Sequence, residues 1–173
     1  MNDDTAINLA FLVFRCGVGA VMLAHGVNHI IGGGKIAGTA RWFGSLGMRY
    51  PVMQAWTASL TEVAAGAGLI AGLLMPFAGA GVVGVMTVAW IINHRKNGFF
   101  IFRPGEGYEY VMTLLMCGVA LGTLGGGEWT LDHALDLDDD FIGGFGFLVS
   151  VFAGGGGGLL LLLACWRPTP SQA

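Results

Sequence analysis

Five long apolar runs, separated by short polar stretches, dominate the chain. They cover about residues 7–31, 52–74, 77–93, 110–124 and 141–166. A helix of roughly 20 apolar residues crosses the hydrocarbon core of a bilayer, and the shorter runs can extend into the interface through terminal Trp, Tyr and Phe side chains. The pattern predicts an all-α fold, a polytopic membrane helix bundle.

The stretch between the first two runs, about residues 36–48, is too short and too polar to span. Its apolar side chains Ile36, Trp42, Phe43 and Leu46 are interspersed with basic residues. This arrangement predicts a short helix in the membrane interface. Two roles fit such a helix: a cap beneath a cavity in the bundle, or an anchor on the membrane surface.

Glycine accounts for 31 of the 173 residues, and much of it lies within the apolar runs. Helices in lipid approach closely where their residues are small. Pro76 makes the connection between the second and third runs very short, so these helices should be antiparallel neighbours. We predict helix-packing roles for glycines of the second and fifth runs, namely Gly68, Gly72, Gly154, Gly155, Gly156, Gly157 and Gly158.

The connections between the runs differ in charge. When the runs are threaded alternately through a membrane, seven of the eight Lys and Arg residues fall on one side and none on the other. The positive-inside rule predicts that the basic side is cytoplasmic, with the N-terminus outside and the C-terminus inside. The seven residues are Lys35, Arg41, Arg49, Arg95, Lys96, Arg103 and Arg167.

Composition narrows the classes of function. With 54% apolar and 11% charged residues, the chain has room for one bundle and for no separate soluble catalytic domain. A net charge of -3 and the lack of a basic stripe with interleaved aromatics argue against nucleic acid as a partner. Cys16, Cys117 and Cys165 each lie inside a run and form no Cys-x-x-Cys pair, so we interpret them as small buried side chains.

Ionisable residues inside the runs are the candidates for chemistry, because they are costly in lipid and usually face the bundle interior. In the first run, helical periodicity places Arg15, His25 and His29 on one flank, and the second run contributes Glu62 near its middle. A guanidinium is long enough to reach a carboxylate at this depth. An ion pair between Arg15 and Glu62 is therefore one expectation.

A second polar layer is expected at the cytoplasmic side. His25 and His29 come to the level of His94, at the end of the third run, and of Glu109 and Tyr110, at the start of the fourth. His25, His29 and His94 have the composition of a weak metal or haem site. We favour the alternative of hydrogen-bonded histidines closing the helix ends, and we assign neither metal nor haem.

The aromatic residues Phe99, Phe100 and Phe102 follow this layer, next to ionisable groups. Such a patch suits an apolar ring with polar edges, for instance a quinone. It suits a membrane lipid or a neighbouring helix equally well.

Several motifs recur together along the chain. They are Phe14-Arg15-x-x-x-Gly19-x-x-x-Leu23-x-His25-Gly26, Trp42-Phe43-x-x-Leu46-Gly47, Leu60-x-Glu62, Asn97-Gly98-Phe99-Phe100 and Gly107-Tyr108-Glu109-Tyr110. As an ordered set they resemble the DoxX family of small bacterial membrane proteins over roughly residues 9–137. The resemblance implies a four-helix domain at 1–137 in the bacterial cytoplasmic (inner) membrane. Carried over position by position, it implies a site of Arg15, His25, Glu62, Asn97, Glu109 and Tyr110.

The chain departs from the family pattern in two ways. Family members commonly have a basic residue near the position of His29, and they usually end after four spans. Here residues 138–173 add an acidic loop, a glycine-rich fifth helix and a short tail. We interpret the fifth helix as a docking element that packs against another subunit.

Three functions from different classes remain. The resemblance links the chain to redox, because DoxD-type relatives form part of a thiosulfate:quinone oxidoreductase and DoxX proteins are associated with assemblies that handle oxidative and thiol stress. We prefer an accessory subunit of a membrane redox or electron-transfer complex that binds a quinone or lipid. The alternatives are a quinone-linked oxidoreductase acting on a small sulfur or phenolic donor, with Glu62 or Glu109 taking the proton, and a small solute transporter.

Overall fold

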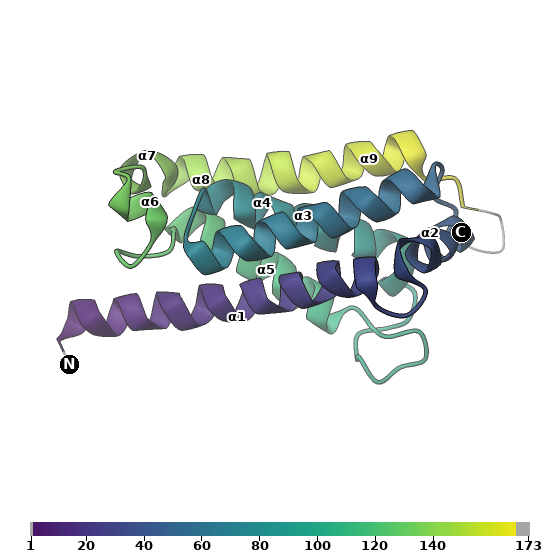
Figure 1. The fold of residues 1–173 in the computed structure, drawn as a ribbon, viewed down its shortest axis with the longest axis horizontal. Coiled ribbons are helices and arrows are strands. Elements are labelled where there is room, and N and C mark those ends of the chain that lie inside the picture. Colours follow the sequence, from purple (N-terminus) through teal and green to yellow (C-terminus); the bar gives the residue numbers. More distant parts are fainter. Residues whose placement is uncertain (1, 169–173) are drawn as a thin grey trace.

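The computed structural model describes residues 2–168, and its regular elements over this range are helices, as the apolar pattern predicted. Figure 1 shows the long helices running side by side along the longest axis. The elements are α1 (Asp3–Ile31), α2 (Lys35–Ser45), α3 (Pro51–Ala71), α4 (Met75–Ala89) continued by the π-helical turn η1 (Trp90–His94), α5 (Glu109–Leu124), α6 (Leu131–Ala134), α7 (Asp138–Phe141), α8 (Gly144–Leu148), the π-helical η2 (Val149–Gly156) and α9 (Gly157–Cys165).

Three segments of the described chain are long and apolar enough to cross a membrane: α1, α4 with η1, and the continuous segment from α8 to α9. The protein is therefore a polytopic helical membrane protein. The other two predicted spans, α5 and α3, are not among these three segments, each for its own reason. Helix α5 is apolar but has only 16 residues. Helix α3 is long enough, but Gln54 and Glu62 on its buried face make it more polar.

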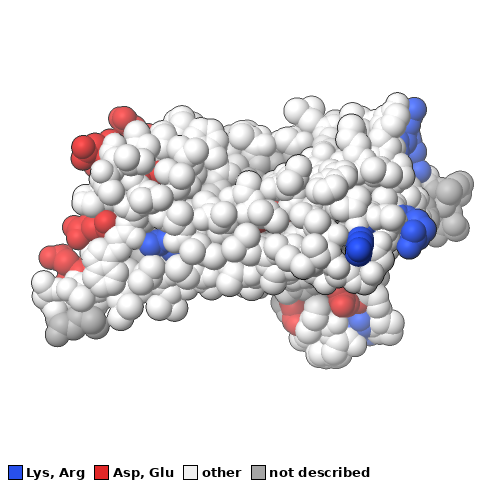
Figure 2. Space-filling model, viewed as in Figure 1, with Lys and Arg blue, Asp and Glu red and all other residues white. Residues whose placement is uncertain are grey.

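Charged side chains lie mainly at the two ends of the bundle. Figure 2 shows acidic residues at the end that holds the start of α1 together with α6 and α7, and basic residues at the end that holds α2 and the end of α9. We call these the acidic end and the basic end. The wide surface between them is almost free of charge in this view, as expected for helices that face lipid.

The acidic end is closed by hydrogen bonds around the turn between α3 and α4. Arg15 of α1 donates to the carbonyl oxygens of Leu69 and Ile70, near the end of α3. The carboxylate of Asp132 in α6 accepts from the backbone N–H groups of Leu74 (2.7 Å) and Met75 (2.9 Å), at the start of α4. Helix ends leave such groups unpaired, so both ends of the turn are satisfied without water.

Glycines bring the helices of the bundle into backbone contact. A Cβ at Gly19 of α1 would lie 2.8 Å from the carbonyl oxygen of Gly66 in α3, and one at Gly66 would lie 2.7 Å from that of Gly19. Among the glycines of the second run, Gly68 faces Ala78 across the α3–α4 turn. Gly72 ends α3 with a φ of 67°, which favours glycine.

Two glycines of the fifth run, Gly154 and Gly158, pack closely inside the chain, and the docking of this helix on another subunit stays a prediction. A Cβ at Gly154 would lie 2.9 Å from the Cα of Ala80, and one at Gly158 would lie 2.9 Å from the carbonyl oxygen of Gly84, both in α4. Gly155 has only ordinary contacts with α4, and nothing in the described chain lies within 4 Å of a Cβ at Gly156 or Gly157. The close approach is thus confined to one face.

The basic end is held by a short connection between the segment after α2 and the end of α9. Met48 and Trp166 form an isolated antiparallel bridge. Around it, the N–H of Arg49 donates to the carbonyl of Cys165 (2.7 Å), and the indole N–H of Trp166 donates to the carbonyl of Leu46 (2.8 Å). The fifth helix is therefore fixed at its glycine face and at its end.

Substituting one glycine of η2 at a time tests the internal packing. Gly154→Ala places a methyl group against the backbone of α4, and such overpacking costs about 1–3 kcal/mol. We expect a lower midpoint of thermal unfolding in detergent. Gly156→Ala is the matched control, because its Cβ meets open space and alanine favours a helix. Equal midpoints for the two variants would contradict this packing.

Candidate functional site

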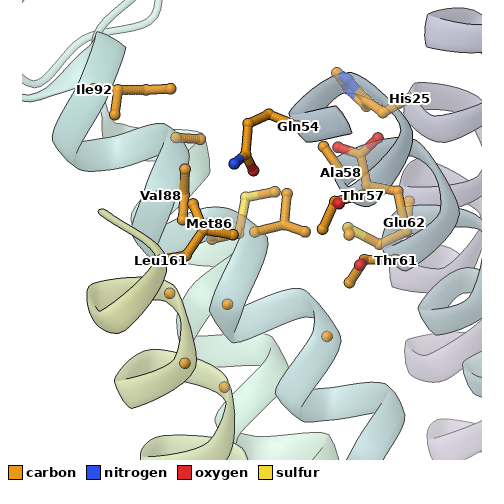
Figure 3. A pocket seen from close by; sticks show the side chains of 18 of the residues that line it. His25, Gln54, Thr57, Ala58, Thr61, Glu62, Met86, Val88, Ile92 and Leu161 are labelled. Atoms are coloured by element: carbon orange, nitrogen blue, oxygen red, sulfur yellow. The ribbon is translucent and has the colours of Figure 1, made fainter. Parts of the chain in front are cut away.

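A cavity of about 360 Å³ lies in the half of the bundle nearer the basic end. Its walls come from α1, α3, α4 with η1, α5 and the segment η2–α9, and α2 lies beneath it through Trp42 and Phe43. In Figure 3, Glu62 and His25 lie on one side, Val88, Ile92 and Leu161 lie on the other, and Gln54 is between them. The cavity thus combines a polar region with apolar walls.

Of the two roles proposed for the interfacial helix, capping a cavity matches the position of α2. Phe43 is buried and Trp42 is half exposed, and both line the cavity. Phe43 packs in a cluster with Met48, Ala55 and Leu162, from three other parts of the chain. Helix α2 is therefore held beneath the cavity by packing against the bundle.

Glu62 of α3 and His29 of α1 form the central polar pair of the cavity. The His29 Nδ1 and Glu62 Oε2 atoms lie 3.1 Å apart, and the exposed fractions of the two side chains are 18% and 5%. The contact meets the distance of an ion pair but not the angles of a hydrogen bond, and neither atom has a hydrogen-bond partner within residues 2–168. Both atoms therefore keep bonding capacity that a bound molecule can use.

His94 and Tyr110 form a second polar pair. His94 ends η1 and is buried, and its Nε2 lies 2.9 Å from the hydroxyl of Tyr110 at the start of α5. Its Nδ1 lies 2.9 Å from the carbonyl oxygen of Glu106. Because a π-helical turn holds one residue more than an α-helical turn, η1 changes the direction in which the following side chains point. Both His94 and Tyr110 line the cavity.

Two of the predicted site residues, Asn97 and Glu109, organise the connection between η1 and α5 and do not line the cavity. The Asn97 side chain donates to the carbonyls of Asn93 and Glu106, each at 3.1 Å. Glu109 accepts from the N–H of Ile101 at 3.0 Å. Phe100 and Phe102 stack in this connection, with ring centroids 5.1 Å apart. The aromatic patch is exposed and separate from the cavity.

Arg15 does not pair with Glu62, so that expectation was wrong. Its guanidinium donates to three backbone carbonyls, those of Leu69, Ile70 and Trp129, at the acidic end. The carbonyls of Leu69 and Ile70 lie at the C-terminal end of α3, where backbone carbonyls carry partial negative charge, so they can hold a buried cation. Glu62 instead pairs with His29 and lines the cavity.

The predicted residues that meet at the cavity are His25, His29, Glu62, His94 and Tyr110. His25, His29 and His94 do not form the weak metal site considered from the sequence, because no group of three or more His, Cys, Asp or Glu side chains within the described range is arranged to hold a metal ion. The chemistry available here is hydrogen bonding and proton exchange by the two polar pairs.

Three polar cavity residues of α3 were not predicted: Gln54, Thr57 and Thr61. They precede Glu62 by eight, five and one residues, and a helix places the first of these on the same face as Glu62. This spacing was a usable signal. Asp132 was also missed as a structural residue, because its partners are backbone N–H groups, which leave no mark in the sequence.

A second hollow, of about 300 Å³, lies at the acidic end beside Asn8, Glu128, His133 and Asp138. His133 is half exposed, and its Nδ1 lies 2.7 Å from Asp138 Oδ2. This hydrogen bond raises the pKa of His133 and lowers the pKa of Asp138. The pair is at the surface, where solvent screens it, so we interpret it as a local loop contact.

Comparison with known proteins identifies the first half of the chain. The family model for DoxX matches residues 10–95. The chain carries a DoxX family domain. A search of curated proteins and a search of solved structures each gave no match.

The DoxX match ends earlier than the resemblance drawn from the motifs, which extended to about residue 137. The matched DoxX region contains most of α1 and all of α2, α3, α4 and η1. It therefore supplies His29, Glu62 and His94, whereas Tyr110 and the cavity glycines Gly154, Gly157 and Gly158 come from later helices.

Arg15→Lys tests the closure of the acidic end. Lysine keeps the charge but lacks the planar fork of donors, so at least one of three carbonyls loses its partner. A buried polar group without a partner costs about 1–3 kcal/mol, and we expect a clear drop in the thermal midpoint in detergent. Arg41→Lys, at an exposed position of α2, is the control and should leave the midpoint unchanged. A similar small effect for both variants would contradict the role assigned to Arg15.

Proposed function

We propose that this DoxX family membrane protein is an accessory subunit of a membrane redox assembly, in which it holds a quinone-type ring compound. The observation that carries the proposal is the cavity between the basic end and the middle of the bundle, with Glu62 and His94 in one polar region and apolar walls around it. A quinone ring has the same division into apolar faces and polar edges. The family link to redox proteins supports the same class of ligand.

The dimensions of the cavity support a ring with a short apolar extension. A volume of about 360 Å³ is at the lower end of the range for small-molecule sites. Its lining residues on α4 and η1 extend from Ala80 to His94, which corresponds to about 20 Å of helix. The end away from His94 is lined by Gly81, Gly84 and Gly158, which present no polar side chain to an apolar extension.

Access from the bilayer is consistent with the surface of the bundle. His25 and Thr57 both line the cavity and are both exposed at the surface. Each lies six residues from the end of its helix at the basic end, a rise of about 9 Å. A ligand dissolved in the membrane can therefore reach the polar pairs without passing through water.

A quinone-linked oxidoreductase is the second candidate. Glu62 Oε2 lacks a hydrogen-bond partner in the described chain, so the carboxylate is available to accept a proton from a bound donor. Glu109, the other carboxylate considered for this role, does not line the cavity. A transporter has less support, because the intramembrane cation Arg15 is engaged by backbone carbonyls at the acidic end and does not line the cavity.

The orientation in the membrane is part of the proposal. We infer that α3 and α5 also cross, which gives five crossings, and that the basic end faces the cytoplasm of a bacterial inner membrane. A fluorescent or enzymatic reporter fused after Ala173 should then be active only in the cytoplasm. A reporter in the connection that contains Asp136 should be active only outside, and the reverse pattern would overturn the orientation.

The proposed ligand is tested by blocking the cavity. The protein is purified from native membranes in mild detergent, and its lipids are extracted and analysed for quinones. Ala58→Trp fills the cavity and should abolish co-purification of quinone, because the side chain of residue 58 lines it. Ala64→Trp is the matched control, since this position of α3 is exposed and does not line the cavity. It should retain the quinone.

The same preparation separates the two candidates. Larger redox subunits that co-purify in fixed ratio would support an accessory role. A chain that is isolated alone and reduces quinone with a sulfur or phenolic donor would support an enzyme. If the unmodified protein carries no quinone and binds none when it is added, the ligand is wrong.

A further inference from the structure

The hydrogen bonds of His94 define which of its nitrogens carries a proton. Nδ1 lies 2.9 Å from the carbonyl oxygen of Glu106. A carbonyl oxygen only accepts, so Nδ1 is the donor in this bond. In a neutral imidazole the other nitrogen is then bare and accepts. Nε2 of His94, which faces Tyr110, is therefore an acceptor.

The orientation of the Tyr110 hydroxyl follows from that assignment. Its oxygen lies 2.9 Å from Nε2 of His94, so the phenol donates its single hydrogen to the imidazole. The side-chain amide of Asn93 is also near Nε2, at 3.3 Å, but this contact is longer. The Tyr110 oxygen keeps its lone pairs, and Tyr110 lines the cavity. The Tyr110 oxygen can therefore accept a hydrogen bond from a ligand in the cavity.

Glu62 presents a second acceptor in the same cavity. Its Oε2 lies 3.1 Å from Nδ1 of His29, and the ionised form of a Glu side chain can only accept hydrogen bonds. Its side chain is 5% exposed, and Oε2 has no hydrogen-bond partner among residues 2–168. A buried oxygen of this kind favours a ligand that supplies the missing hydrogen.

We propose that the cavity selects a ligand that donates hydrogen bonds from hydroxyl groups on an apolar ring, the chemistry of a quinol or another phenol, over the oxidised quinone. The inference rests on the proposed function, since it names the form of the ring compound that the cavity holds. The carbonyl oxygens of a quinone only accept, so they would lie against the lone pairs of Tyr110 and Glu62. If Tyr110 turned its hydrogen towards a quinone, His94 would lose its short hydrogen bond.

The test compares ubiquinol-1 with ubiquinone-1, which differ by the two hydroxyl hydrogens. Binding of each to the purified full chain is measured anaerobically by titration calorimetry, with reductant present in the quinol arm. We expect the quinol to bind about tenfold more tightly or better, the equivalent of one hydrogen bond. Equal binding, or tighter binding of the quinone, overturns this inference and leaves the proposed function in place. Binding of neither compound overturns both.

Two variants identify the groups responsible. Tyr110→Phe removes one acceptor and should weaken quinol binding about tenfold while quinone binding changes little. Tyr108→Phe, next to the same helix but outside the cavity, is the control and should bind as the unmodified chain does. Glu62→Gln adds a donor where there was an acceptor, so it should improve quinone binding relative to quinol. A quinol preference that survives both Tyr110→Phe and Glu62→Gln contradicts the assignment.

Discussion

A buried guanidinium that donates to backbone carbonyls holds the acidic end of this bundle together. Arg15 joins α1 to the end of α3 and to the segment before α6, and Asp132 of α6 in turn caps α4. In a membrane there is no water to satisfy these groups, so each must find its partner within the protein. The charges at this end are therefore engaged in closing the helix turn, and Arg15 and Asp132 take no part in the cavity.

The opposite half of the bundle is built differently, and this difference creates the site. There the helices are held by α2 beneath them and by the bridge between Met48 and Trp166. Between this floor and the closed end, the chain leaves a cavity with Glu62 and Tyr110 in its wall. Substitutions at the acidic end should therefore affect mainly the stability of the fold, and substitutions around the cavity should affect mainly ligand binding.

The sequence predicted most of the helices and several of the polar residues that meet at the cavity, because apolar runs, short turns and depth in the membrane follow directly from residue order. His25, His29, His94 and Tyr110 were placed near one level in this way, whereas Glu62 was expected nearer the middle of the membrane. The partners of Arg15 were not predictable, because every residue has a backbone carbonyl and the sequence does not show which carbonyls will accept from the guanidinium. For the same reason a glycine face, such as that of Gly154, does not reveal whether it packs on its own chain or on another.

The spacing of the Arg15 contacts along the chain has a consequence for biogenesis. Its acceptors lie 54, 55 and 114 residues further on, so they leave the ribosome well after α1 has entered the translocon. Until Trp129 is translated, the cation lacks its full set of partners within an apolar segment. The first helix must then either stay near the translocon or keep Arg15 in contact with water, and lateral release into lipid becomes favourable only late in synthesis.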